Sequence, residues 1–318
     1  MILIIFGVFS CILSIKLTSP LLRKKIIVKP NLRSSHIIPT PSGGGINFLI
    51  PSIIYLILKF IFAEINNFDY FLITIIPLSI ISFIDDLIEL DPQKRYIFQL
   101  LTILTLLIIS LNANPDLYNF IEINVLTKLF FIVLNILFLT AILNFINFMD
   151  GIDGLVTLCM SIQFLVTSFV ISPLYFLFVG ILIGFIFFNW SPAKLFMGDV
   201  GSIFLGSIYS ISLLQSKNIL EFISLSLIST PLLGDAFFCV IRRIIRGDSL
   251  GKPHKLHLYQ RLNQNGWSHS KVSFFYGLAT IMLALVYFTG SFYLLLSFSL
   301  MTILLGIYLD KYIAKPFK

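Results

Sequence analysis

Five aspartates lie where apolar stretches of this chain end. Asp85 and Asp86 are adjacent in "FIDDL", Asp150 and Asp153 belong to "NFMDGIDGL", and Asp199 belongs to "FMGDVGS". A carboxylate at the edge of a hydrocarbon phase is costly unless it is paired, hydrated or bound to a metal ion. Three such groups on one face of a membrane therefore predict a site for a divalent cation.

Each motif alone has a simpler interpretation. An Asp-Asp pair at a helix end is usually solvated, Asp-Gly favours turns, and Asp199 could cap the helix that follows it. A calcium loop of the EF-hand type is excluded, because Ser161 stands where that loop needs a glutamate. Together, all-oxygen ligands favour Mg²⁺, or Mn²⁺, over zinc. Mg²⁺ keeps positions for water and substrate phosphate, so we expect a phosphate-bearing substrate.

A basic segment rich in histidine follows near the C-terminus, at residues 242–271. Arg246, His254, His257 and Arg261 are its candidate ligand contacts. Binding to anionic lipid headgroups would explain the arginines, but not two histidines three residues apart. Such a pair could share one helical face and contact one anion. No cysteine or third histidine stands nearby in the sequence, which argues against zinc.

The segment "PTPSGGGI" contains Ser42 and Gly44 and precedes an apolar run. Its glycines allow close approach of the backbone to a phosphate or to another helix. A flexible connecting loop is the alternative interpretation.

The elements that position these residues are predicted to be membrane helices. Of 318 residues, 58% are apolar and 12% are charged, and the mean hydropathy is +0.98. A soluble protein carries roughly twice that charge, and apolar runs of about 20 residues recur along the chain. We therefore expect one all-α polytopic domain over 1–318, with 10 or 11 membrane helices. The expected spans are 1–20, 46–63, 68–84, 96–113, 126–148, 155–171, 173–189, 201–215, 220–241, 272–289 and 291–309.

The basic residues predict the orientation of these spans. Eleven spans divide the connections into two sets, and one set contains almost all Lys and Arg, whereas the other contains little beyond Lys59, Lys128 and Lys217. By the positive-inside rule the basic set is cytoplasmic, in a bacterial inner membrane. The acidic motifs lie on the same side. The net charge of +7 is thus an orientation signal first, and we expect no nucleic-acid partner.

In this order, "PTPSGGGI", "FIDDL", "NFMDGIDGL", "FMGDVGS" and "PHKLHLYQRL" resemble the polyprenyl-phosphate N-acetylhexosamine-1-phosphate transferases. This family includes the phospho-MurNAc-pentapeptide transferase and the GlcNAc-1-phosphate transferases. The resemblance implies transfer of a sugar-1-phosphate from a UDP-sugar to undecaprenyl phosphate, with Mg²⁺ at a cytoplasmic site and UMP as the second product. It covers about residues 36–262.

The resemblance also implies roles for single residues. Asp199 would be a direct Mg²⁺ ligand. The pair Asp85 and Asp86 would hold the metal ion and the attacking phosphate, with Asp86 as the second metal ligand. Asn147 and Asp150 would line the nucleotide pocket, and Phe196 would stack on uracil. Asp85 has been proposed as a base, but we favour a positioning role, because a lipid phosphate needs little help from a base. Arg246, His254 and His257 would neutralise charge on the UMP leaving group.

Other assignments are less complete. His254 and His257 are separated by Lys255 and Leu256, unlike the consecutive histidines of the peptidoglycan enzyme, which argues against a MurNAc-pentapeptide substrate. The ending resembles the branch that initiates O-antigen, a part of lipopolysaccharide, with a deoxy-aminosugar. Asp153 either contacts substrate or braces the turn, whose glycines are expected to leave room for a nucleotide. The role of Asp235, the choice of UDP-N-acetylaminosugar and a homodimeric state stay open.

A transporter and a structural scaffold are the alternatives to a transferase. An ion- or proton-coupled transporter would place its carboxylates near the membrane midplane, on broken helices of repeated halves. Here the carboxylates cluster at one face, and the sequence shows no internal repeat. A structural scaffold would need no ordered acidic motifs.

Overall fold

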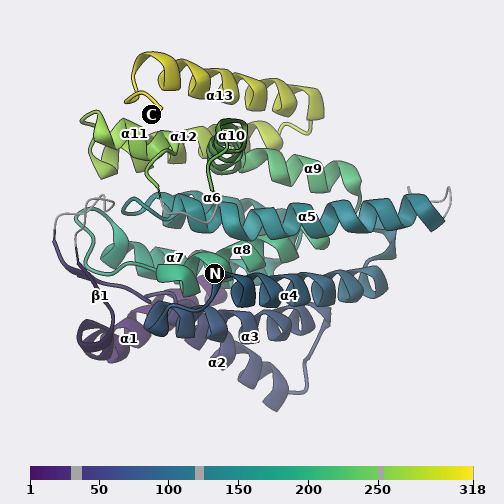
Figure 1. Ribbon diagram of the computed structural model, residues 1–318. Coiled ribbons are helices and arrows are strands. Elements are labelled where there is room, and N and C mark those ends of the chain that lie inside the picture. The colour runs from purple at the N-terminus through teal and green to yellow at the C-terminus, as the bar shows by residue number, and fades with distance from the viewer. Residues whose placement is uncertain (30–37, 119–124, 250–253, 318) are drawn as a thin grey trace.

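The computed structural model of the protein describes residues 1–29, 38–118, 125–249 and 254–317. Parts of the expected connections, at 30–37 and 250–253, lie outside the described residues. The longer helices run roughly parallel through the bundle (Figure 1). The α-helices are α1 (Ile2–Lys25), α2 (Ile46–Ile61), α3 (Asn67–Ile88), α4 (Pro92–Ala113), α5 (Val125–Met149), α6 (Leu155–Val170), α7 (Phe176–Asn189), α8 (Gly198–Leu214), α9 (Ile219–Ile228), α10 (Thr230–Arg246), α11 (Leu258–Gln264), α12 (His269–Tyr287) and α13 (Phe292–Tyr312).

Short elements supplement these helices. Two 3-10 turns, η1 (Pro115–Tyr118) and η2 (Pro173–Tyr175), precede α5 and α7, and two strands, β1 (Ile27–Val28) and β2 (Thr40–Pro41), pair antiparallel. The expected all-α fold is confirmed, with this strand pair as its one addition among the described residues.

Polar caps begin several helices at the ends of apolar stretches. The Asn66 side chain accepts the Phe68 N–H at 3.0 Å, and the Asp69 carboxylate accepts the Asn66 N–H at 2.8 Å. The two bonds form a capping box at the start of α3. Ser268 and Ser291 cap α12 and α13 in the same general way. Such caps satisfy backbone donors that the helix itself leaves unpaired.

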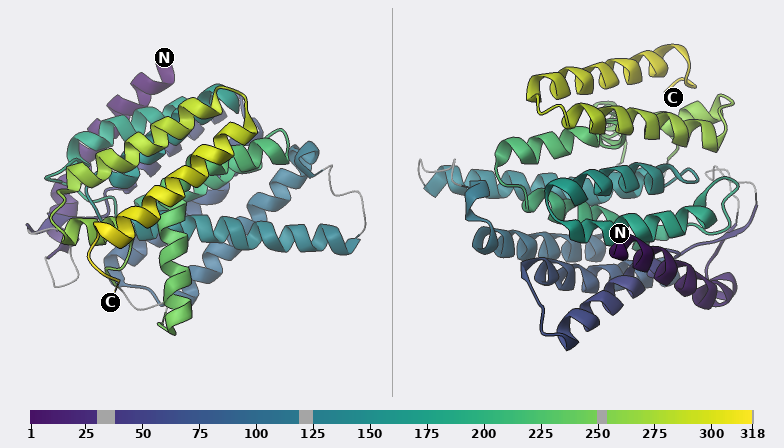
Figure 2. Two further views of the ribbon diagram at one scale, coloured as in Figure 1. Left: turned by 90° about the horizontal axis from the view of Figure 1, so that it is seen from above. Right: turned by 180° about the vertical axis from the view of Figure 1, so that it is seen from behind.

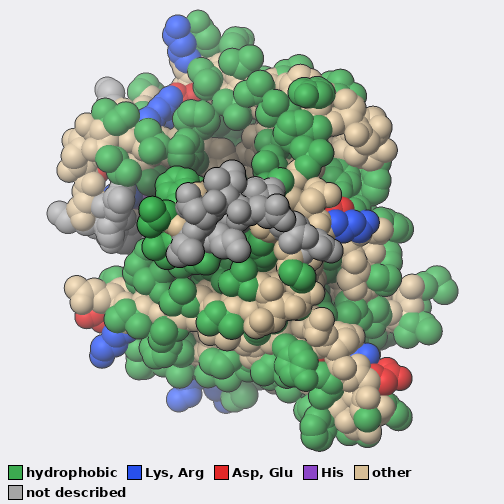
Figure 3. Space-filling model, turned by 90° about the vertical axis from the view of Figure 1, so that its right-hand side faces the viewer, with side chains coloured by type: hydrophobic (Ala, Val, Ile, Leu, Met, Phe, Trp, Pro, Cys, Tyr) green, Lys and Arg blue, Asp and Glu red, His purple; other side chains and the backbone are tan. Residues whose placement is uncertain are grey.

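Six described helices are long and apolar enough to span a membrane, and α9 with α10 forms a seventh if the bent pair is one span. Four shorter apolar segments, namely α2, α6, η2 with α7, and α8, complete the bundle. The chain is therefore a membrane-embedded protein, whereas the number of eleven spans stays a prediction. The bundle end seen in Figure 3 is mostly hydrophobic, with scattered charged side chains.

The expected span 220–241 is wrong as a single helix. α9 ends at Ile228, and α10 starts at Thr230 at an angle of 82° to it. Pro231 is the physical reason, because proline lacks an N–H and disfavours a helical residue before it. As a result α10 runs across the bundle, seen end-on in Figure 1 and projecting outward in Figure 2.

α8 is the central helix of the bundle. Every residue from Val200 to Leu214 is buried, and α8 packs against both α3 and α5. The helices that carry the three acidic motifs are therefore neighbours. Because α3 and α5 end near the start of α8, their polar residues meet at one end of the bundle.

Candidate active site

The first contact of the site joins α3 to α8. The Asp86 carboxylate accepts the backbone N–H of Asp199 at 2.9 Å and of Val200 at 3.1 Å. Gly198 allows this approach, since a Cβ at that position would lie 2.6 Å from Asp86 Oδ2, and its φ is +71°. Asp86 thus caps α8 from another helix, and two of the predicted acidic motifs meet.

Asp199 is held from two further sides. Its Oδ1 accepts the side-chain amide of Asn147 at 3.0 Å, and its Oδ2 accepts the Arg95 guanidinium at 3.1 Å. The same Arg95 nitrogen donates to Asp85 Oδ2 at 2.7 Å, and Asp85 Oδ1 accepts the Leu90 N–H at 2.6 Å. Arg95 therefore bridges two acidic motifs. The sequence indicated only that Arg95 belongs to the basic side of the membrane; its place in the first turn of α4, shortly after the Asp-Asp pair, was the available signal.

The glycine-rich segment lies against the loop before α8. Phe196 N–H donates to Pro41 O at 2.9 Å, Gly44 N–H donates to Phe196 O at 2.9 Å, and Gly45 N–H donates to Met197 O at 2.8 Å. A Cβ on Gly44 would lie 2.6 Å from Phe196 O. Of the two predicted purposes for these glycines, the structure supports close approach to another part of the chain.

These contacts border a cavity of about 340 Å³ at one end of the bundle. Ser42, Asn147, Asp150, Asp153 and Phe196 line it, as predicted candidates, together with Asp86 and Asp199. Asp85 does not line the cavity. Its side chain is 6% exposed and forms an ion pair with Arg95. The remaining lining residues are Val28, Gly151, Ile152, Asn189, Gly198, Gln260 and His269.

The turn after α5 uses its polar groups to fix its own shape. Asp153 Oδ2 accepts the Ala193 N–H at 3.2 Å and lies 3.1 Å from His269 Nδ1. Burial acts to raise the pKa of Asp153, but His269 and the Ala193 N–H outweigh it and lower that pKa. A Cβ on Gly154 would meet the Trp190 ring at 2.7 Å, and one on Gly151 would meet the Tyr259 hydroxyl at 2.2 Å. Protein side chains therefore occupy the position of a Cβ at both glycines, although Gly151 itself lines the cavity. That these glycines make room for a nucleotide stays a prediction.

The carboxylates of the cavity repel one another. Burial, followed by the charges of Asp199, Asp86 and Asp153, raises the pKa of Asp150 well above its usual range. A divalent cation would relieve this repulsion, and the oxygen ligands in the cavity suit Mg²⁺. The residues present therefore fit the predicted ion, with Asp199 and Asp86 as its candidate ligands.

The histidine segment lies beside this cavity but does not line it. His254 lies outside the helices, between α10 and α11, and His257 is the N-cap of α11. Asp235 fixes the start of α11 at Leu258, because its carboxylate accepts the N–H groups of Leu258 at 2.7 Å and Tyr259 at 3.0 Å. The expectation that both histidines share a helical face is wrong. Asp235 now has a structural role, and it also lies 3.7 Å from His257 Nδ1.

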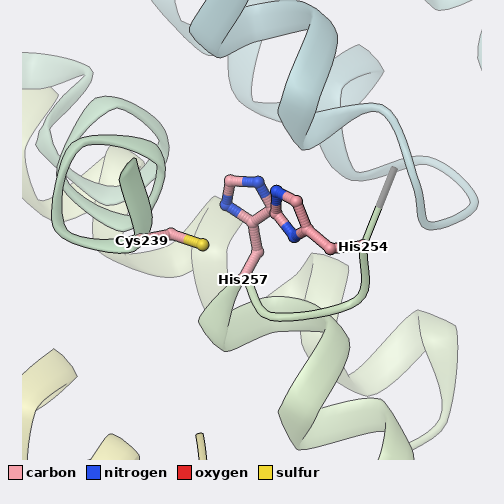
Figure 4. A group of neighbouring side chains, drawn as sticks. All are labelled: Cys239, His254 and His257. Atoms are coloured by element: carbon pink, nitrogen blue, oxygen red, sulfur yellow. The ribbon is translucent and has the colours of Figure 1, made fainter. Parts of the chain in front are cut away.

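The two imidazoles nevertheless lie next to each other. Their ring centroids are 5.1 Å apart with planes at 28°, and Cys239 projects toward them from α10 (Figure 4). One ligand atom from each of these three side chains lies within 4.8 Å of the others. Cys239 is therefore close to the pair in the fold although it is distant in the sequence, and the expectation that no cysteine lies nearby is wrong. Stacked rings direct their in-plane lone pairs side by side, however, which does not suit one shared metal ion.

His254 was expected to neutralise charge on the UMP leaving group, but its surroundings disfavour its protonated form. Burial, and then the positive charges of His257 and Arg243, lower the pKa of His254 to about 4. At neutral pH it is uncharged. It can donate a hydrogen bond to an anion, but it does not bring a positive charge to one.

Arg246 and Arg261 lie outside the cavity. Arg246 pairs with Asp248 at 2.6 Å at the end of α10. Arg261 is 3% exposed, pairs with Asp310, and donates to the carbonyl of Lys315 at 2.8 Å. These contacts hold α11 against the C-terminal segment, so the predicted substrate contacts of both arginines are not supported by their positions.

Comparisons with known proteins agree with the motifs. A family model described as glycosyl transferase family 4 matches residues 68–217, which include all five aspartates. The chain is 29% identical to a protein of Bacillus subtilis named as a probable undecaprenyl-phosphate N-acetylglucosaminyl 1-phosphate transferase, over 85% of this chain and 80% of that relative. It is 31% identical to a phospho-N-acetylmuramoyl-pentapeptide-transferase of Prochlorococcus marinus, over 67% of this chain and 69% of that relative. A protein of Streptococcus pneumoniae with the same name is 30% identical, over 52% of this chain and 56% of that relative.

Proposed function

Because the chain belongs to glycosyl transferase family 4, we propose that it transfers a sugar-1-phosphate from a UDP-N-acetylaminosugar to undecaprenyl phosphate. The names of its relatives support a phosphotransferase, and one of them names this acceptor. The observation that carries the proposal is the cavity in which Asp86, Asn147, Asp150 and Asp199 meet. It joins the carboxylates of three distant motifs at one end of a membrane bundle.

The reaction exchanges one diphosphate for another. An oxygen of the lipid phosphate attacks the β-phosphorus of the donor, the bond from that phosphorus to the bridging oxygen breaks, and UMP leaves. Catalysis then depends on bringing two anions together and on neutralising their charge. When bound at Asp199 and Asp86, Mg²⁺ would supply this neutralisation at the diphosphate oxygens.

The protein's own groups complete the site. Asn147 and Asp150 line the cavity for the nucleotide, and Phe196 presents an aromatic ring at its wall. Arg95 is held by Asp85 and Asp199, and its side chain is 38% exposed, so that it can also contact a phosphate. Asp85 therefore orients Arg95, which supports positioning over a base role.

The cellular role follows from the same chemistry. A lipid-linked diphosphate sugar is the starting unit of a cell-envelope glycan, and we propose O-antigen or a related polymer as the product. The basic connections favour a site that faces the cytoplasm across the inner membrane. The carboxylates gather at one end of the bundle, so no observation favours a transporter.

The test offers four donors side by side. Membranes containing the protein, undecaprenyl phosphate and Mg²⁺ receive sugar-labelled UDP-GlcNAc, UDP-GalNAc, UDP-FucNAc or UDP-QuiNAc. We expect labelled lipid and UMP from at least one donor, and loss of both with Asp199→Ala. Glu64→Gln is the control, because Glu64 is exposed and pairs with Lys59. No transfer from any donor, or full activity of Asp199→Ala, would contradict the proposal.

A further inference from the structure

His269 is a cavity residue that the sequence analysis did not select. It is the first residue of α12, and its side chain is 12% exposed. Among the described residues that line the cavity, it is the only histidine, lysine or arginine. The histidines of the "PHKLH" segment, which were expected to contact the substrate, lie outside that lining.

A network of contacts holds the His269 ring. Its Nδ1 lies 3.1 Å from Asp153 Oδ2, and Asp153 is itself 8% exposed. The same Asp153 oxygen accepts the Ala193 N–H at 3.2 Å, and the Asp153 carbonyl accepts the Ser273 hydroxyl at 2.8 Å. A carboxylate bonded to one imidazole nitrogen fixes both the orientation of the ring and its tautomer. The turn after α5 and the start of α12 thus build one rigid unit.

The charge of the cavity indicates what this unit does. Asp86, Asp150, Asp153 and Asp199 line the cavity, so the ionisable side chains that an anionic donor meets on the described wall are acidic apart from His269. Asp86 and Asp199 are the candidate metal ligands, whereas Asp153 is engaged by His269 and Ala193. Ser42 and Gln260 also line this wall as neutral donors, but His269 is its one basic side chain among the described residues, and its imidazole can donate to a phosphate oxygen.

We propose that His269 contacts the diphosphate of the nucleotide-sugar donor, with Asp153 as its positioning residue. This inference rests on the proposed function, because the diphosphate belongs to the proposed donor. It assigns the role expected of the "PHKLH" histidines to a residue of α12. Asp153 thereby acts through His269.

The experiment compares UDP with uridine as ligands of the full chain in detergent with Mg²⁺. Calorimetry should show that His269→Ala weakens UDP binding roughly 10- to 100-fold, the size expected for one hydrogen bond to a charged group. Uridine binding should stay unchanged. His269→Gln should recover part of the loss, because its amide can still donate. Lys271→Ala is the matched control, since Lys271 is a basic residue on the same helix that packs on Trp267.

Asp153→Asn tests the positioning role. It should weaken UDP binding less than His269→Ala does, and the double variant should bind UDP no more weakly than His269→Ala alone. Melting temperatures identify variants that do not fold; for those, His269→Gln gives the comparison.

Several results would overturn the inference. Unchanged UDP affinity in both His269 variants, or equal weakening of UDP and uridine, would exclude the diphosphate contact. If one of these two results is found and the wild type still transfers sugar, only the role assigned to His269 fails, and the proposed function stands. If the wild type neither binds UDP nor transfers any sugar, the proposed function fails with it.

Discussion

Asp85 and Asp86 are neighbours in the chain but have different partners. Asp86 caps α8 and lines the cavity, whereas Asp85 binds Arg95 and the Leu90 N–H behind it. Successive residues of a helix point about 100° apart, so two adjacent carboxylates cannot both face one cavity in the same way. At the scale of the residue, the Asp-Asp motif therefore combines a cavity group with a support group.

This difference gives a prediction for Asp85→Asn. If Asp85 orients Arg95, the variant should lose about 10- to 100-fold in kcat/KM, with a pH profile parallel to that of the wild type from pH 6.5 to 9.5. Asp91→Asn, in the turn before α4, is the control. A base role would instead produce substantial recovery at high pH, so recovery in the sugar-transfer assay would refute the positioning role.

His254 gives a prediction about stability. Its pKa is lowered to about 4 from an unfolded value of about 6.5. Below pH 6.5 the unfolded chain binds a proton that the folded chain does not, so the folded state loses stability as the pH falls toward 4. Glutamine does not bind a proton in this pH range, so the His254→Gln variant does not lose stability in this way. The melting temperature of the wild type minus that of the variant should therefore fall between pH 7.5 and pH 5, and a constant difference would contradict the assignment.

At the scale of the element, close contacts without side chains set the distances between helices. Gly7 of α1 meets Gly180 of α7 through backbone, since a Cβ on Gly7 would lie 3.0 Å from the Gly180 Cα. α2 and α8 meet in the same way at Gly45 and Gly201, where a Cβ on Gly45 would lie 2.1 Å from the Gly201 Cα. Small residues are favoured at such crossings in membranes, because they allow backbones to pack closely.

Gly45→Val tests whether this approach builds the site. The new side chain must push α2 from α8, which would also separate Pro41 and Gly44 from Phe196. We expect a loss of about 1–3 kcal/mol in stability, or more, and a sharp fall in sugar transfer. Gly306→Ala is the control, because its Cβ would meet only Leu258 at 3.8 Å. Wild-type activity in Gly45→Val would show that the close contact is dispensable.

At the scale of the whole molecule, one end of the bundle gathers the carboxylates of three motifs, and His269 is the one basic side chain among the described residues of the cavity wall. The pKa of Asp150 is raised because burial and the other carboxylates disfavour its ionised form. The folded state therefore loses stability as the pH rises through that raised pKa. A bound divalent cation would offset this loss.

Magnesium should accordingly stabilise the protein in detergent. A ligand at 100 times its dissociation constant adds about 2.7 kcal/mol to the folded state, so the melting temperature should rise with Mg²⁺ and fall again with EDTA. Asp199→Asn should reduce the shift strongly, and Glu64→Gln should leave it intact. An equal shift in Asp199→Asn and the wild type would place the ion elsewhere.

The sequence by itself determined the class of protein, the position of most helices and the set of acidic motifs at one end. Hydrophobic runs and polar caps are local signals, so they can be read without a structure. The structure decided which side chains share the cavity. Long-range contacts brought Arg95, Gln260 and His269 to the site or its edge, and the capping of α11 by Asp235 left His254 and His257 outside it. Such contacts join residues far apart in the chain, and local periodicity carries no information about them.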